Sequence, residues 1–197
     1  MRIIINEYKS EWKTFFKNEK ELLQVLLANE YVSINHIGST SIPGLPAKPI
    51  VDISVGVGNL KDEHFYSKLL ESSGYTYNTG SKFQEWILYS KKKRPQFFHL
   101  HIMPHNSTRL LDQLIFKNCV MHSKRLQESY TWLKKYYRDH DDGLFYSMNK
   151  LPFVSNVVEA FKKGFSESSG CPQADVYQYV LNNFDETNEL LSRNRVL

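Results

Sequence analysis

A glycine, two hydroxyl residues, a lysine and an acid lie in the order and spacing that phosphate chemistry uses. They are Gly38, Ser39, Thr40, Lys48 and Asp52. Glycine lets backbone N–H groups approach a phosphate closely, a serine hydroxyl adds a donor, and a carboxylate can hold the metal ion that screens phosphate charge. These parts suit the binding or transfer of a phosphorylated group.

Histidines form a second candidate group. His99 and His101 alternate along one predicted strand and therefore share a face, and His36 lies near the end of an earlier strand. Together with Asp52 they offer imidazole nitrogens and one carboxylate oxygen, a set suited to zinc, manganese or iron. As a neutral imidazole, His99 or His101 could instead act as a general base. The alternative is that they are ordinary hydrogen-bonded residues of a strand.

The elements that must position these residues follow from local pattern. Alternation over 31–37 predicts a strand that ends at Gly38, and prolines in 39–48 exclude a long helix there. The β-branched run 50–55 predicts a second strand, with Asp52 on the face opposite its apolar residues. An ordered loop should therefore connect the glycine turn to the acid.

The remaining elements are predicted from periodicity and breakers. Helices are expected over 12–27 with Ser10 as cap, from Asn59 to a left-handed stop at Gly74, and in three stretches after Thr108. Strands are expected over 75–78, 83–90 and 96–103, with the basic run 91–95 as a solvated hairpin connection. The segment 166–170 is expected to be a linker before a last helix containing Val176, Val180, Leu181 and Phe184.

The string 36–55 closely resembles the signature of the GrpB-type proteins, a family placed in the nucleotidyltransferase superfamily. Segments 8–19, 99–101 and 146–154 look like its opening helix, its histidine-containing strand and a helical segment with a lysine, Lys150. The resemblance implies an α+β fold, in which a nucleotidyltransferase-like mixed sheet flanked by helices is followed by a helical C-terminal region. It also implies a cleft lined by Gly38, Ser39 and Asp52. We expect a core over 1–105, a helical region over 106–165 and an extension over 166–197.

This chain differs from the wider superfamily in the acidic residues that could bind a metal ion. Active nucleotidyltransferases usually carry a second acid two residues along the strand, where this chain has Ser54, and a third acid on a later strand. At about 4 Å and an effective dielectric constant of about 20, each lost carboxylate charge removes roughly 4 kcal/mol of attraction to the metal ion for every unit of metal charge. This value does not include the cost of desolvating the charges. Two alternatives are open. Asp52 holds one magnesium or manganese ion mostly bound by nucleotide phosphates, or Asp52, His36, His99 and His101 hold a transition metal such as zinc.

Composition limits the class of protein. The chain has 197 residues, of which 41% are hydrophobic, and a net charge of 25 − 21 = +4. Such a chain can bury a sizeable core, and the charge surplus is too small to indicate nucleic acid as a partner. The apolar run Ile3–Ile5 is too short to suggest a membrane segment. The two cysteines, Cys119 and Cys171, do not suggest a disulfide framework. We therefore expect a cytoplasmic protein.

The leading hypothesis is a nucleotidyltransferase-fold protein that binds a nucleotide or another phosphorylated small molecule. Its candidate reaction is metal-dependent nucleotidyl transfer to a hydroxyl or amine. Asp52, His101 and Lys150 are then the candidate catalytic residues, with Lys150 as the cation. Two alternatives are open: a catalytically silent nucleotide-binding module, for which Ser54 argues, and a metal-dependent hydrolase that uses His99 and His101.

Overall fold

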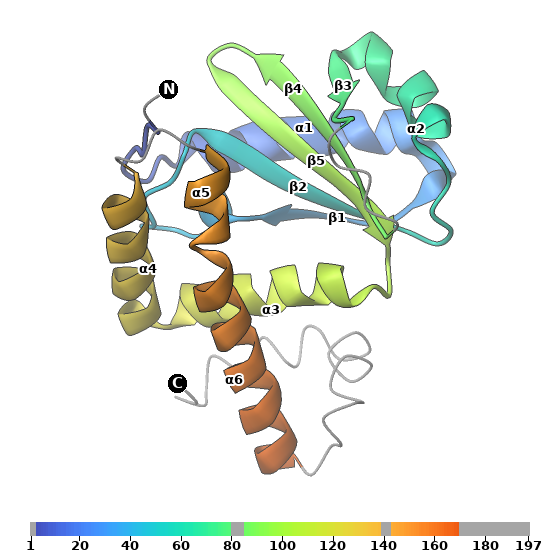
Figure 1. The fold of residues 1–197 in the computed structure, drawn as a ribbon. Coiled ribbons are helices and arrows are strands. Elements are labelled where there is room, and N and C mark those ends of the chain that lie inside the picture. Colours follow the sequence, from blue (N-terminus) through green and yellow to red (C-terminus); the bar gives the residue numbers. More distant parts are fainter. Residues whose placement is uncertain (1–2, 80–84, 139–142, 170–197) are drawn as a thin grey trace. The chain divides into compact units, whose positions relative to one another are not determined.

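A mixed β-sheet organises the first half of the chain (Figure 1). The computed structural model describes residues 3–79, 85–138 and 143–169. The described residues form a five-stranded sheet in the order β1-β2-β5-β4-β3. Its strands are β1 (Tyr31–Ile37), β2 (Ile50–Val57), β3 (Tyr75–Tyr77), β4 (Ile87–Lys93) and β5 (Gln96–Pro104). β2 and β5 are parallel and all other neighbours are antiparallel.

Among the described residues, one α-helix comes before the first strand, one lies between two strands in chain order, and four come after the last strand. They are α1 (Glu11–Leu27), α2 (Glu63–Leu70), α3 (Thr108–His122), α4 (Lys124–Tyr137), α5 (Gly143–Met148) and α6 (Leu151–Ser169). By contacts the chain divides into a unit of residues 6–110, which contains the whole sheet, and a helical unit that begins at Leu111 and includes the first residues. The predicted α+β class, a mixed sheet with flanking helices and a helical C-terminal part, is confirmed.

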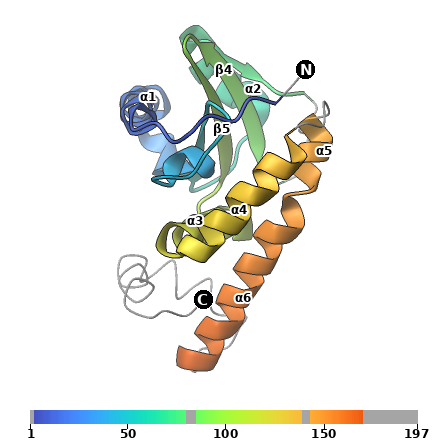
Figure 2. The same cartoon turned by 90° about the vertical axis from the view of Figure 1, so that its left-hand side faces the viewer.

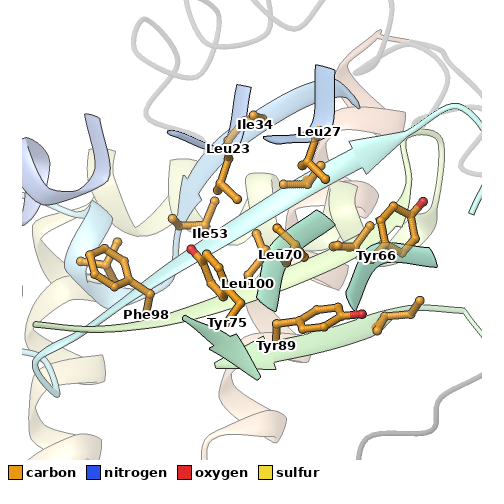
Figure 3. Packing of buried hydrophobic residues seen from close by; sticks show 14 of the residues in the cluster. Leu23, Leu27, Ile34, Ile53, Tyr66, Leu70, Tyr75, Tyr89, Phe98 and Leu100 are labelled. Carbon is orange, nitrogen blue, oxygen red and sulfur yellow. The ribbon is translucent and has the colours of Figure 1, made fainter. Parts of the chain in front are cut away.

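One face of the sheet forms the main core of the first unit (Figure 3). α1 and α2 pack on this face, where Leu23 and Leu70 contact strand residues such as Ile53 and Leu100, all four fully buried. Burying an aliphatic side chain of this size contributes roughly 1.5 to 3 kcal/mol. Because side chains alternate along a strand, the neighbours of Ile53 and Leu100 must point to the opposite face. That face carries the candidate site.

Two helix starts differ from the prediction, and one helix stop agrees with it. Ser10 precedes α1 as expected but makes no side-chain capping hydrogen bond. The second helix begins at Glu63 rather than near Asn59, because the carboxylate of Asp62 accepts the backbone N–H of Phe65 at 2.8 Å and caps it there. Gly74 does adopt the left-handed conformation expected at the stop.

Two predicted connections are also wrong. The basic run is not a solvated hairpin loop, because 91–93 belong to β4 and the turn is formed by Arg94 and Pro95. The expected linker at 166–170 is helical as far as Ser169, the end of α6. The start of the strand predicted from Phe83 and the predicted last helix with Val176 to Phe184 lie outside the described residues.

Figure 2 shows the helices α3, α4 and α6 as ribbons, and aromatic side chains of these helices contact one another. Tyr130 of α4 stacks on Phe153 of α6 with ring centroids 5.1 Å apart, and Phe116 of α3 meets both edge-on. Cys119 is a buried free thiol on α3. Within the described residues, no helix has the length and apolar character needed to cross a membrane.

A buried lysine in this helical unit gives the first testable prediction. Lys134 is 1% exposed, and burial, with the charge of Lys150 as a smaller cause, lowers its pKa to about 7. The unfolded chain then binds more protons than the folded one above this pH, so folding stability should rise with pH by at most about 1.4 kcal/mol per unit. We expect Lys134→Met to remove this rise between pH 7 and 9 in chemical denaturation. The exposed Lys124, changed in the same way, is the control; equal slopes for all three proteins would contradict the prediction.

Candidate functional site

The candidate site lies where the two parallel strands run side by side. In the register of β2 and β5, Asp52 is opposite His99 and Ser54 is opposite His101. All four side chains belong to the face opposite the α1 and α2 core, since Ile53 and Leu100 between them point into that core. The parallel pairing therefore brings the acid and both histidines of β5 together.

The distances within this group are those of metal ligands or hydrogen-bond partners. The Oδ1 atom of Asp52 lies 3.3 Å from Nδ1 of His99 and 3.6 Å from Nε2 of His101. These three atoms lie within 4.8 Å of one another. The side chains of His99, Asp52 and His101 are 36%, 29% and 13% exposed, so the group is partly open to solvent.

The glycine turn meets the other oxygen of the same carboxylate. A Cβ atom placed on Gly38 would lie 2.5 Å from Oδ2 of Asp52, closer than any side chain could come. Gly38 also has φ 67° and ψ −176°, a backbone conformation that other residues adopt at a cost of about 1 to 3 kcal/mol. Its carbonyl accepts hydrogen bonds from the hydroxyl and the backbone N–H of Ser41 at 2.7 and 3.1 Å. Glycine is thus required for this turn to pack on Asp52.

Electrostatics favour an ionised Asp52. Burial alone would raise the pKa of its carboxyl group, but hydrogen bonds from His101 and His99 and the positive charge of these rings hold the pKa well below its usual range. The charge of this carboxylate also acts on Lys48. Burial lowers the pKa of Lys48, and the negative charge of Asp52 opposes this shift. The bridge between Asn6 and Ala47 fixes the chain just before Lys48.

The structure does not bring His36 to this group. In the antiparallel register His36 is opposite Ile53, so its ring lies on the α1 face, stacked on Phe16 with centroids 4.7 Å apart. Its Nε2 atom is 3.0 Å from the hydroxyl of Thr40, which is 1% exposed. His36 and Thr40 thus fasten the turn to β1, whereas Ser39 beside them is half-buried.

Two further predicted positions have separate surroundings. Ser54, at the place of a second acid, is fully buried, and its hydroxyl has no hydrogen-bond partner among the described residues. Lys150 belongs to the helical unit, where its Nζ atom lies 4.2 Å from the ring centroid of Tyr146. Its role at the site therefore stays a prediction.

Two residues beside the site were missed by the sequence analysis. Trp86, 7% exposed, stacks on the ring of His101 at a centroid distance of 5.3 Å and an angle of 26°. The guanidinium of the exposed Arg109 lies 3.9 Å above the ring of Trp86. Trp86 therefore holds the imidazole of His101 in place and carries a cation close to the group.

A separate groove of about 570 Å³ lies beyond the other ends of β2 and β5. It is lined by Gly58, Asn59, Leu60, Glu85, Pro104, Asn106, Ser107 and Thr108. None of the predicted site residues lines it. Among the described residues, the groove has no cluster of potential metal ligands comparable to that at Asp52, so the group at Asp52 is the candidate site.

The fold and the site define an α+β protein whose mixed sheet presents an aspartate and two histidines beside a Gly-Ser turn. The family model described as GrpB protein matches residues 2–160, and the chain belongs to this family. A crystal structure of the conserved protein GrpB from Enterococcus faecalis is similar, with a TM-score of 0.71 and 28% identity, over 79% of this chain and 95% of that chain.

Curated relatives agree with this assignment. The chain is 27% identical to the glutamate-rich protein GrpB of Alkalihalophilus pseudofirmus, over 79% of this chain and 94% of the relative. It is 26% identical to the UPF0157 protein YqkA of Bacillus subtilis over 83% of this chain, and spans about half (49%) of that relative's length. A structure of the GLD-2/RNP-8 complex shares the fold, with a TM-score of 0.53 and 10% identity, over 91% of this chain and 68% of that chain.

Proposed function

We propose that this protein binds a nucleotide or another phosphorylated small molecule, together with a divalent metal ion, at the surface that the Gly38 turn and Asp52 form side by side. The observation that carries the proposal is the contact of the turn with the carboxylate, in which Oδ2 faces Gly38 and Oδ1 faces two imidazoles. A phosphate needs close backbone approach, a hydroxyl donor and nearby positive charge. Gly38, Ser39 and Lys48 are the candidates for these three roles.

The reaction that this arrangement would serve is nucleotidyl transfer, the activity that the nucleotidyltransferase resemblance implies. An acceptor oxygen or nitrogen attacks the α-phosphorus, the bond to the pyrophosphate leaving group breaks, and the acceptor proton passes to a base. A neutral imidazole of His101 or His99 can take that proton. A divalent ion bound at Asp52 supplies charge stabilisation of the phosphoryl oxygens.

A ligand screen by thermal denaturation tests the proposal. Nucleotides and other phosphorylated small molecules are added with magnesium, manganese or zinc, and product formation is followed in parallel. A ligand at 100 times its Kd should stabilise the protein by about 2.7 kcal/mol. Stabilisation without turnover would identify the silent binding module that the buried Ser54 favours; no stabilisation by any ligand would reject binding itself.

Gly38→Ala should separate the binding role of the turn from its backbone strain. The new Cβ would displace the Asp52 carboxylate, so we expect both a stability loss of about 1 to 3 kcal/mol and loss of ligand-induced stabilisation. Gly44→Ala is the matched control, because Gly44 also has a positive φ of 79° but its Cβ would meet no atom within 4 Å. Denaturation with and without ligand measures both effects. Retained ligand stabilisation in Gly38→Ala would count against the site.

A further inference from the structure

The atoms that face Asp52 Oδ1 are spaced as ligands of one small metal ion. With bonds of about 2.1 Å, two ligand atoms of a tetrahedral ion are about 3.4 Å apart. The observed separations from Oδ1 are 3.3 Å to His99 Nδ1 and 3.6 Å to His101 Nε2, and all three atoms lie within 4.8 Å of one another.

The donor set does not fit a two-magnesium centre. Magnesium takes oxygen ligands in octahedral geometry, and two such ions need several carboxylates. Here the group contains a single carboxylate, and Ser54, where a second acid would stand, is fully buried. Two imidazole nitrogens and one carboxylate oxygen suit zinc, manganese or iron instead.

The surroundings hold the three side chains in place. Trp86 stacks on the ring of His101, and the rings of His99 and His101 meet edge-on at 80°. The second oxygen of Asp52 lies against the turn at Gly38. Outer contacts of this kind orient metal ligands and tune their affinity.

We propose that Asp52, His99 and His101 form a mononuclear site for a divalent transition-metal ion, with coordination positions left for an oxygen of a bound phosphate. The ligand atoms are Oδ1 of Asp52, Nδ1 of His99 and Nε2 of His101. In its phosphate part the inference rests on the proposed function, while the metal site stands on the geometry alone. Both imidazoles are then metal ligands, so in this form of the site the acceptor proton passes to solvent water instead of to a histidine.

Calorimetric titration of untagged, metal-free protein with ZnCl2, MnCl2 and MgCl2, without nucleotide, tests this site. We expect one Zn²⁺ per chain, bound on the order of 100-fold more tightly than Mg²⁺. His99→Gln should weaken Zn²⁺ binding by at least about tenfold. His99 is 36% exposed, so this change should leave the fold intact, which thermal denaturation verifies. His64→Gln, at an exposed histidine of α2, should leave Zn²⁺ binding unchanged.

Zn²⁺ binding no tighter than Mg²⁺ binding, or an equal loss in His64→Gln and His99→Gln, would overturn the metal site. His101→Gln, followed by the visible absorption of bound Co²⁺, gives a second measurement on an independent ligand. Since no nucleotide is present, the result is separate from that of the ligand screen. Tight Zn²⁺ binding in this titration, with no phosphorylated ligand stabilising the protein in the screen, would keep the metal site and reject the proposed function. Stabilisation by a phosphorylated ligand in the screen, without tight Zn²⁺ binding in the titration, would keep the proposed function and reject the metal site.

Discussion

Asp52→Asn is expected to abolish metal-dependent stabilisation by a phosphorylated ligand, together with any nucleotidyl transfer. The change removes the unit charge next to both histidines while it keeps the size of the side chain. At about 4 Å and an effective dielectric constant of about 20, that charge contributes roughly 4 kcal/mol per unit of metal charge before desolvation. Thermal denaturation with ligand and metal, and product formation under the same conditions, measure the loss.

Asp62→Asn is the matched control for this change. Asp62 caps α2 through its carboxylate, and asparagine is an equally good N-cap residue. The same chemical substitution at Asp62 should therefore leave stability and ligand binding near the values of the unchanged protein. The proposed function would be contradicted if Asp52→Asn kept the ligand response of the unchanged protein. It would also be contradicted if Asn106→Ala, in the separate groove, removed that response.

Glu19→Gln is expected to destabilise the fold by about 3 to 5 kcal/mol, because it leaves a buried lysine charge without its partner. Oε1 of Glu19 lies 2.6 Å from Nζ of Lys91, with side chains 4% and 6% exposed. The hydroxyl of Tyr75 donates to the same oxygen at 3.0 Å, and burial beside Glu19 raises the pKa of Tyr75. Chemical denaturation at neutral pH measures the free energy of unfolding.

A more exposed ion pair in the same unit provides the comparison. Glu30 and Lys61 are 2.9 Å apart but 31% and 38% exposed, so Glu30→Gln should cost at most about 1 kcal/mol. Replacing Glu19 and Lys91 together by methionine should recover most of the stability lost in Glu19→Gln, since an apolar pair leaves no buried charge. Equal losses for Glu19→Gln and Glu30→Gln would show that burial does not set the energy of the first pair.

Much of the sheet unit follows from local pattern. The alternation of β1 and the β-branched residues of β2 place Asp52 opposite an apolar face, and the structure has both strands where they were predicted. The order of the strands depends on long-range pairing, which local pattern does not encode. That pairing, the parallel contact of β2 with β5, is what brings His99 and His101 to Asp52.

The errors have identifiable physical causes. His36 shares its strand face with the buried Ile34, so alternation alone would have placed it on the core side, away from Asp52. Lys91 was read as part of a charged run, but as a strand residue paired with Phe98 it points towards the core and meets Glu19. Glu19 lies within the apolar stripe of α1, which is the sequence signal for a buried ion pair.

Trp86 could have been found from the turn between β4 and β5. With Arg94 and Pro95 as the turn, Lys93 is opposite Gln96, and counting back places Leu88 opposite His101. Trp86, two residues earlier, then lies on the same face as the histidine. Arg109 could not have been predicted in this way, because its approach to Trp86 depends on where the chain enters α3.

Electron–nuclear double resonance of Mn²⁺ bound to the untagged protein with the phosphorylated ligand tests the central claim most directly. The account predicts couplings to imidazole nitrogen and to phosphorus in the same ion, with the nitrogen couplings reduced in His99→Gln. Phosphorus couplings without nitrogen would mean that the ligand alone holds the ion. Nitrogen without phosphorus would mean that no phosphate reaches the metal beside Asp52. Either result would contradict a shared metal and phosphate site.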